Sequence, residues 1–317
     1  MKEINKKNKK NKVQLAVQWL EVGPNAEHQR VDNFLIKILK IPKARIYQMI
    51  RKGEVRVNKK RVDPADKLNL GDKVRVPPIE KNKLPKIETV EANYKILLEN
   101  ILYEDPQVLI LNKPEGLAVH SGSGIQMGVI EVLKLLKPEE KFLELAHRLD
   151  KETSGCLIIA KSRTALLYFH NLFKTGQIKK IYRAWVCGHW PKNLNKIDLK
   201  LQINKQTASG KKVQAIQKER LVSERGREET KEKEALTTFK VLGYEENKTY
   251  MEIYLHTGRT HQIRVHCQSA GFPVMGDDRY GRREKILSAK RLYLHCYQIK
   301  FSLPDGKLIR VEAPVPF

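Results

Sequence analysis

The chain has 317 residues, 41% of them hydrophobic, and a formal net charge of +25 at pH 7. This length allows roughly two domains with buried cores, and no stretch approaches the ~18 consecutive apolar residues of a membrane-spanning helix. The large basic excess indicates a polyanionic partner. A membrane surface is the weaker interpretation, because no basic helix carries bulky aromatics along one side.

The N-terminal segment is basic but contains neither a long apolar stretch nor a small-residue cleavage site. Residues 1–20 are therefore expected to form a disordered basic tail and not a signal peptide, which favours a cytoplasmic location. The basic excess is concentrated near this end of the chain, because residues 1–90 contain 23 Lys and Arg against 10 Asp and Glu.

Residues 21–85 are predicted to form a small α+β domain. Apolar residues from Val31 to Leu39 recur at helical spacing, so this stretch is expected to be an amphipathic helix. Pro42 opens a second helix, which Gly53 ends. A short strand, a turn over 58–60 and a second strand near 72–77 complete a hairpin.

Basic residues cluster on the second helix and the hairpin. A solvated charged face is the ordinary explanation of such a cluster, but charge of one sign on adjacent elements favours phosphate binding. The stretch RKGEVRVNKKRV resembles the core of the S4 RNA-binding domain, and this resemblance implies contact with RNA. The expected RNA-binding residues are Lys43, Arg45, Arg51, Lys52, Arg56, Lys59, Lys60 and Arg61.

Residues 86–97 form the expected linker, and residues 98–317 the expected large domain. Helical periodicity appears over 129–138, 164–176 and 259–271. Strand-like runs are more numerous, several with alternating polarity. They are QVLILNKP, GCLIIAK, KKIYRAWVCG, TTFKVLGY, YMEIYLHTG and RLYLHCYQIKF. This mixture predicts an α+β fold with a mixed, mainly antiparallel sheet.

A highly charged segment interrupts the large domain. Residues 211–234 carry eight basic and six acidic side chains. We expect a mobile insertion over 204–234, because such a composition cannot bury a core. The four cysteines lie far apart, and the spacing of His256, His261 and His266 does not match a zinc site, so no metal site is predicted.

The stretch AHRLDKETSG places a lone acid, Asp150, between two cations. Asp150 alone is compatible with a turn or a helix N-cap. Four longer stretches change this interpretation, because in this order and spacing they resemble the RluA-type pseudouridine synthases. They are NKPEGLAVHSGSG (112–124), HRLDKETSG (147–155), KKIYRAWV (179–186) and TGRTHQIRVH (257–266).

The resemblance implies isomerisation of uridine to pseudouridine in 23S ribosomal RNA, either naked or in an early assembly intermediate, by a monomeric enzyme. No cofactor is implied, since the reaction oxidises nothing and adds no group. Asp150 matches the family's catalytic aspartate. Addition to C1′, addition to C6 and removal of a proton from C2′ are all open to it.

The same resemblance assigns further site residues. Arg264 is expected to pair with Asp150 and keep it ionised, and Tyr182 to stack on the flipped base. Arg148 is expected to fill the space left by that base. The remaining two residues, His147 and Leu294, are expected to support the pocket. From pattern alone, Arg264 also fits a surface helix, and Tyr182 and Leu294 also fit an ordinary core.

Two other functions are compatible with parts of this pattern. One is an RNA-binding ribosome assembly factor that has lost catalysis. The other is an RNA glycosylase, but that chemistry normally needs a second carboxylate as general acid, and Glu152 is not expected to serve.

Overall fold

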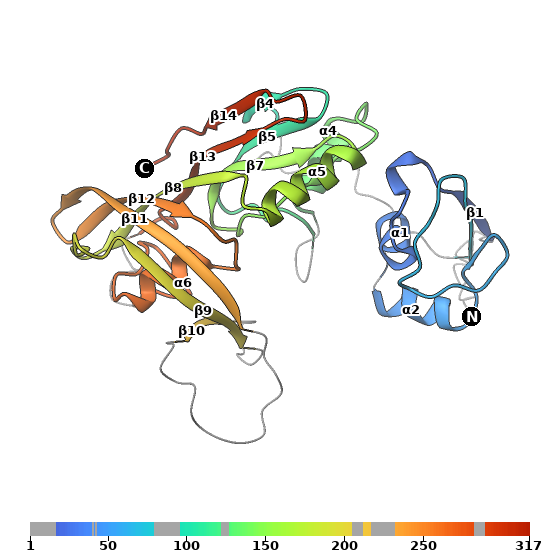
Figure 1. The fold of residues 1–317 in the computed structure, drawn as a ribbon, viewed down its shortest axis with the longest axis horizontal. Helices are drawn as coiled ribbons and strands as arrows, with labels where there is room; N and C mark the ends of the chain where they lie inside the picture. Colours follow the sequence, from blue (N-terminus) through green and yellow to red (C-terminus); the bar gives the residue numbers. More distant parts are fainter. Residues whose placement is uncertain are drawn as a thin grey trace, which may run out of the picture. The chain divides into compact units, whose positions relative to one another are not determined.

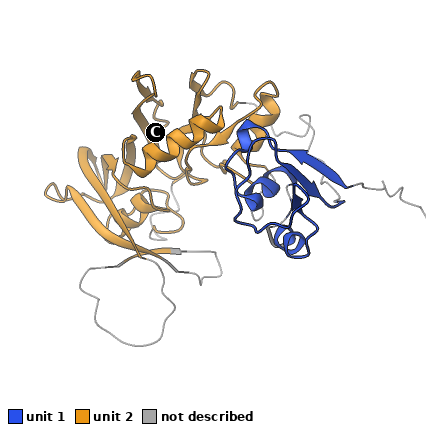
Figure 2. Cartoon of the chain, turned by 45° about the vertical axis from the view of Figure 1, so that its right-hand side comes forward, with its two compact units in different colours: residues 1–86 blue, residues 87–317 orange. Residues whose placement is uncertain are grey.

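The computed structural model describes residues 17–39, 41, 43–78, 96–121, 127–204, 212–216, 232–281 and 289–317. The chain divides into two compact units, residues 1–86 and 87–317 (Figure 2). No helix in the described ranges is long and apolar enough to span a membrane.

The smaller unit combines two helices with a three-stranded antiparallel sheet in the order β1-β3-β2. Its elements are β1 (Gln18–Glu21), the 3-10 turn η1 (Pro24–Ala26), α1 (Val31–Leu39), α2 (Lys43–Arg51), β2 (Arg56–Val57) and β3 (Lys73–Val76). The predicted helix pair and hairpin are confirmed. Asn58 and Lys59, with positive φ angles of 49° and 69°, form a two-residue turn of type I′ conformation that pairs Val57 with Lys60, while the whole connection from β2 to β3 spans residues 58–72.

The prediction of a disordered tail over 1–20 is wrong at its end. Residues 18–20 belong to β1, where Trp19 pairs with Arg75 of β3 and Leu20 with Val74. The alternation of this segment was hidden by the basic residues before it, and Leu20 packs against the apolar core of the small unit. Residues 1–16 of the expected tail lie outside the described residues.

In its described residues, the larger unit is built on one sheet of eleven strands, which Figure 1 shows. Nine strands follow the order β10-β9-β11-β12-β8-β13-β7-β5-β4, while β14 pairs with β13 and β6 with β7. Within the described residues every pair is antiparallel except β13 with β7. The expected α+β class with a mixed, mainly antiparallel sheet is therefore confirmed.

The strands of this sheet come from the whole length of the unit. They are β4 (Ile101–Glu104), β5 (Val108–Lys113), β6 (Glu144–Leu145), β7 (Ser154–Ala160), β8 (Lys179–Cys187), β9 (Lys196–Asn204), β10 (Lys212–Ile216), β11 (Lys233–Glu245), β12 (Lys248–Leu255), β13 (Leu294–Ser302) and β14 (Leu308–Glu312).

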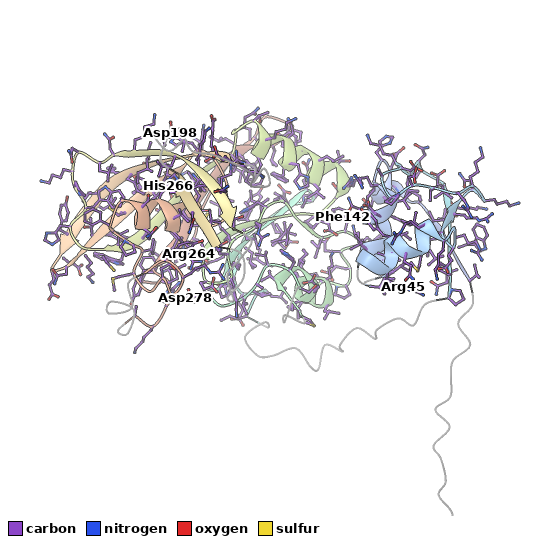
Figure 3. The ribbon with its side chains drawn as sticks, turned by 90° about the horizontal axis from the view of Figure 1, so that it is seen from below. Arg45, Phe142, Asp198, Arg264, His266 and Asp278 are labelled. Carbon is purple, nitrogen blue, oxygen red and sulfur yellow. The ribbon has the colours of Figure 1, made fainter. Side chains whose placement is uncertain are left out.

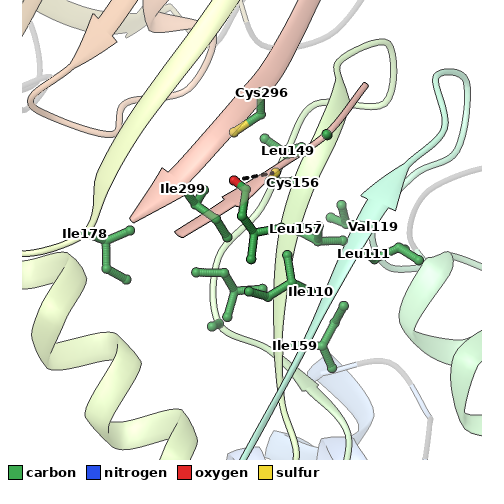
Figure 4. Packing of buried hydrophobic residues seen from close by; sticks show 14 of the residues in the cluster. Ile110, Leu111, Val119, Leu149, Cys156, Leu157, Ile159, Ile178, Cys296 and Ile299 are labelled. Carbon is green, nitrogen blue, oxygen red and sulfur yellow. Dashed lines mark hydrogen bonds between the residues drawn. The ribbon is translucent and has the colours of Figure 1, made fainter. Parts of the chain in front are cut away.

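Within the described residues of this unit, three helices share the apolar core with the strands: α4 (Val129–Leu136), α5 (Arg163–Lys174) and α6 (Gln262–Ser269). All three were predicted from their apolar periodicity. Helix α5 contacts β7, and α6 contacts β9, β10 and β11. Figure 4 shows the apolar packing around β7, where Leu157 and Ile159 lie near Ile110 and Leu111 of β5.

The expectation of a mobile insertion over 204–234 is wrong for part of that segment. Residues 212–216 form β10, which pairs with β9, and Lys233 and Glu234 already belong to β11. Val213 is buried in a small cluster that includes Val265 and Tyr280. The overall charge of the insertion concealed this short apolar alternation. Residues 205–211 and 217–231 lie outside the described part.

The parallel pairing of β13 with β7 fixes the end of the Asp150 loop. Ser154 lies opposite His295 and Gly155 opposite Cys296. Gly155 has a φ of +107°, and a Cβ atom there would lie 2.3 Å from the carbonyl oxygen of Cys296. Only glycine fits both constraints, so the sequence motif ends in a sterically required residue.

Candidate active site

The large unit contains a cavity of ≈ 790 Å³ at which the predicted motifs converge. Segments 146–150 and 255–264 line it together with side chains from β8 and β13. Each of the six site residues predicted for this domain lies on its wall: His147, Arg148, Asp150, Tyr182, Arg264 and Leu294.

Asp150 lies in a tight turn that leads into β7. Its carbonyl accepts a hydrogen bond of 3.1 Å from the backbone N–H of Thr153. The turn interpretation of the sequence is thus correct for the backbone, while the side chain lines the cavity and keeps 18% of its surface exposed. The backbone of Asp150 thus forms the turn, while its side chain faces the cavity.

Two side-chain nitrogens lie near the Asp150 carboxylate, one beside each of its two oxygens. Arg264 Nη1 lies 3.9 Å from Oδ2, and His261 Nε2 lies 3.8 Å from Oδ1. Both distances are within ion-pair range but longer than hydrogen bonds. Arg264 Nη1 also lies 3.7 Å from Glu152, whose side chain is 40% exposed.

The tight partner of Arg264 is Asp277 (Figure 3 labels Arg264 and the neighbouring Asp278). Arg264 Nε donates to Oδ2 of Asp277 at 2.8 Å, and Nη2 donates to Oδ1 at 2.7 Å. The backbone N–H groups of Arg279 and Tyr280 donate to the same Oδ1 atom. Both oxygens of Asp277 therefore bind Arg264 through Nε and Nη2, and Nη1 of Arg264 is left to face Asp150.

Arg264 is a buried residue and not a surface helix arginine, since only 2% of its side chain is exposed. Burial alone would lower the pKa of Arg264, but the hydrogen bonds to Asp277 and the nearby carboxylates outweigh it and raise that pKa. A permanent positive charge consequently sits behind the Asp150 loop.

Tyr182 of β8 and Leu294 of β13 form part of the apolar wall of the cavity, and both are buried. Burial raises the pKa of Tyr182 well above its ordinary value. The phenol therefore keeps its proton, so it can donate a hydrogen bond or stack but does not act as a phenolate base. Leu294 is opposite Ala184 in the β13–β8 pairing.

His147 braces the loop, while Arg148 projects from it. His147 Nε2 accepts a hydrogen bond of 3.0 Å from the Ile158 N–H, and its ring packs against Phe173. Burial, helped by the charge of Lys180, lowers the pKa of His147 to about 3. Arg148 is exposed, and its side chain forms no hydrogen bond or ion pair with any described residue.

Lys113 supports the other side of the Asp150 turn. Its buried ammonium donates to the carbonyls of Pro114, Leu117 and Lys151 at 2.7, 2.9 and 3.0 Å. Burial lowers the pKa of Lys113 to about 7. This single side chain ties the 114–117 loop to the residue that follows Asp150.

The ionised side chains on the cavity wall have nearly one sign. Among the described lining residues Asp150 is the only acid, and the cations are Arg148, Lys174, Lys180, Arg259 and Arg264. Such a wall favours an anionic ligand. Within the described ranges no group of His, Cys, Asp and Glu side chains is arranged to hold a metal ion.

The predicted RNA-binding residues lie in the smaller unit. Lys43 begins α2. The other seven are exposed, and none of them forms an ion pair with a described carboxylate. They are Arg45, Arg51, Lys52, Arg56, Lys59, Lys60 and Arg61. Their charges are therefore available to a polyanion.

Two residues that shape this site, Asp277 and His261, were not predicted from the sequence. His261 was considered only as a zinc ligand, although it stands inside a recognised motif. Lys113 also stands in such a motif, and its buried side chain fixes a loop at the edge of the pocket. Asp277 lies in GDDRYG, outside every recognised stretch, and its only signal was a pair of adjacent acids in a basic chain.

Comparison with known proteins identifies the family to which the chain belongs. The sequence model of the RNA pseudouridylate synthase family matches residues 107–269, and that of the S4 domain matches residues 29–74. The chain belongs to the RNA pseudouridylate synthase family and carries an S4 domain ahead of the matched region.

Two relatives are similar over almost the whole chain. The ribosomal large subunit pseudouridine synthase C of Escherichia coli (strain K12) is 43% identical, and that of Salmonella typhimurium (strain LT2) is 42% identical. Each alignment covers 95% of this chain and 93% of the relative. The solved structure of human RNA pseudouridylate synthase domain containing 4 is 26% identical with a TM-score of 0.57, covering 70% of this chain and 91% of that one.

Replacing Asp277 with Asn should destabilise the large unit, because it leaves the buried Arg264 charge without its carboxylate. The expected loss is about 3–5 kcal/mol of unfolding free energy, as for other broken buried ion pairs, measured by urea denaturation.

Asp278→Asn is the matched control. Asp278 is 75% exposed, and its contact with Arg264 Nη2 is long at 3.4 Å. Its replacement should therefore lower the free energy of unfolding by less than about 1 kcal/mol. Equal losses in the two variants would show that the fork does not carry the stability assigned to it.

Proposed function

We propose that this protein isomerises uridines to pseudouridine in large-subunit ribosomal RNA. The main observation that supports this proposal is the position of the Asp150 carboxylate. It lies on the wall of a ≈ 790 Å³ cavity that Tyr182 also lines, with Arg264 near one oxygen and His261 near the other. The names of the relatives, which are large-subunit pseudouridine synthases, support the choice of RNA.

The reaction is a rearrangement within one nucleotide. The C1′–N1 bond breaks and a C1′–C5 bond forms, while C5 loses its proton and N1 gains one. No atom enters or leaves overall, and nothing is oxidised. The chemistry therefore needs one carboxylate at the reacting nucleotide and a path for one proton.

In this proposal Asp150 acts directly on the flipped nucleotide. Attack at C1′, attack at C6 and abstraction of the C2′ proton all use an ionised carboxylate. Arg264 places its buried positive charge 3.9 Å from that carboxylate and so orients it. Tyr182 stacks on the base, and its neutral hydroxyl relays the proton by accepting it from C5 while it passes its own proton on toward N1.

In this proposal Arg148 assists the flipping of the target uridine out of the RNA stack. A uridine in folded RNA leaves its stack at a cost of a few kcal/mol before a side chain can reach it. An exposed guanidinium next to Asp150, with no partner among the described residues, is suited to fill the vacated space and contact phosphate. His147 and Leu294 hold the loop and the pocket floor.

The S4 domain, proposed to span residues 21–85, supplies further RNA affinity through its basic residues. Lys43 and the seven exposed basic residues contact phosphates in this proposal. We further propose a linker over 86–97, a catalytic domain over 98–317 and a cytoplasmic monomer that acts on naked rRNA or an early assembly intermediate.

Asp150→Asn should reduce the rate of pseudouridine formation by at least about a thousandfold, because removal of an essential catalytic group has effects of this size. Affinity for RNA should stay within a factor of about two of the native value, since the cations are unchanged. Mass spectrometry of large-subunit rRNA transcripts measures the product, and filter binding measures affinity.

Glu152→Gln is the matched control, because it removes a carboxylate from the same turn and should retain activity. A native rate for Asp150→Asn would refute the role of Asp150. A native chain that binds RNA but forms no pseudouridine would favour the assembly factor.

The cations of the small unit should set part of the salt dependence of RNA binding. Changing Lys59 and Lys60 to Gln should lower the slope of log K against log salt by about 1.4, or ~0.7 for each lost phosphate contact with single-stranded RNA.

The matched change is Lys37 and Lys67 to Gln, which removes the same charge from the same unit outside the predicted cluster. An identical slope change in both double variants would mean that the cluster has no special contact with RNA.

A further inference from the structure

His261 connects the Asp150 carboxylate to a hydrogen-bonded chain that the reaction scheme above does not use. One ring nitrogen, Nε2, lies 3.8 Å from Oδ1 of Asp150. The other, Nδ1, lies 2.8 Å from the hydroxyl oxygen of Tyr280. The Tyr280 oxygen in turn accepts a hydrogen bond of 3.3 Å from the Val213 N–H of β10.

The two neighbours of the ring favour the same tautomer. A carboxylate at Nε2 is attracted to an N–H and repelled by a lone pair. The Tyr280 hydroxyl oxygen accepts a hydrogen bond from Val213 and lies 2.8 Å from Nδ1, which is the geometry in which the hydroxyl donates its proton to that nitrogen. Burial lowers the pKa of His261 and raises that of Tyr280, so the ring is neutral and the phenol keeps its proton.

The backbone of His261 is held firmly enough for such a role. His261 has a φ of +54° and caps α6. The next residue, Gln262, is buried and accepts hydrogen bonds from the Thr257 hydroxyl and the Arg259 N–H. Its amide donates to the Leu236 carbonyl and to the Thr237 hydroxyl. The ring of His261 therefore leaves a loop that is fastened to β11.

We propose that His261 is a positioning residue for Asp150, and that the Tyr280 hydroxyl sets its tautomer so that Nε2–H faces the carboxylate. Arg264 Nη1 then faces Oδ2 and His261 Nε2–H faces Oδ1, which fixes the plane of the carboxylate. The 3.8 Å separation shortens when a nucleotide fills the cavity, as catalytic contacts commonly do on substrate binding. This inference rests on the proposed function.

Because the chain of contacts begins at Val213, β10 also has a part in the site. The strand lies in the segment that sequence composition assigned to a mobile insertion. Val213 and Tyr280 share one apolar cluster with Val265 of α6. The insertion thus contributes an ordered backbone donor to the group that orients Asp150.

The tautomer is tested by long-range ¹⁵N–¹H correlation spectra of the free, histidine-labelled protein, with the His261 signals assigned by their loss in His261→Gln. The Nε2–H tautomer is expected in the native protein, and a mixture of both tautomers in Tyr280→Phe. Observation of the Nδ1–H tautomer in the native protein would overturn the proposal, and this readout requires no activity.

Kinetics of the same variant give the second test. Tyr280→Phe should lower kcat about five- to tenfold, the effect of one hydrogen bond in the transition state, and leave KM for RNA within about twofold. Tyr168→Phe is the control, since it removes a hydroxyl that donates to the Ser302 carbonyl elsewhere. Native kcat in Tyr280→Phe would overturn the proposal.

Substitution of His261 itself separates positioning from backbone strain. Asn places an amide where Nδ1 lies, while the longer Gln reaches the position of Nε2. Asn suits a positive φ better than Gln, so a purely structural role predicts a higher kcat for His261→Asn. The proposal predicts the higher kcat for His261→Gln.

An equal kcat, or a higher one for His261→Asn, contradicts the proposal. The native protein assayed in parallel keeps the two hypotheses apart. A native chain that forms no pseudouridine would refute the proposed function, whereas an active native chain with unaffected variants would refute only the role of His261.

Discussion

The site depends on one buried ion pair, between Arg264 of α6 and Asp277. An unpaired guanidinium with 2% of its side chain exposed would be too costly to keep in the fold. Asp277 offsets that cost with two hydrogen bonds and, by using Nε and Nη2, directs Nη1 toward Asp150. The position of the positive charge is thus set by Asp277, and Asp150 lies close to it without a hydrogen bond.

The sheet brings these parts together from distant stretches of the chain. The single parallel contact among the described strands, β13 beside β7, places Leu294 near the end of the Asp150 loop. The antiparallel neighbour β8 brings Tyr182 to the same wall. Lys113 then fixes the turn from behind by binding the Lys151 carbonyl. Asp150, Tyr182, Arg264 and Leu294 come from four different elements, the turn before β7, β8, α6 and β13, so packed helices and strands surround Asp150 even though it lies in a loop.

The sequence predicted correctly those features whose signal lies within one short, continuous stretch of residues. Helical periodicity predicted α4, α5 and α6, and contiguous motifs predicted Asp150 and Arg264 as cavity residues. The sequence did not predict those features that depend on contacts between residues far apart in the chain. The strands β1 and β10 are only four and five residues long, too short for a clear sequence pattern, and they form because a neighbouring strand is present. No local pattern marks Asp277 as the partner of Arg264, since that pairing exists only after α6 has packed.

The most direct test of this account is the single-turnover rate of Arg264→Lys on large-subunit rRNA. Lysine keeps the charge but cannot bind Asp277 with two hydrogen bonds and face Asp150 at the same time. The account predicts a fall of about a hundredfold, the size expected when a catalytic group is misplaced by about 1 Å. A rate equal to that of the native protein would contradict it, because charge alone would then be enough.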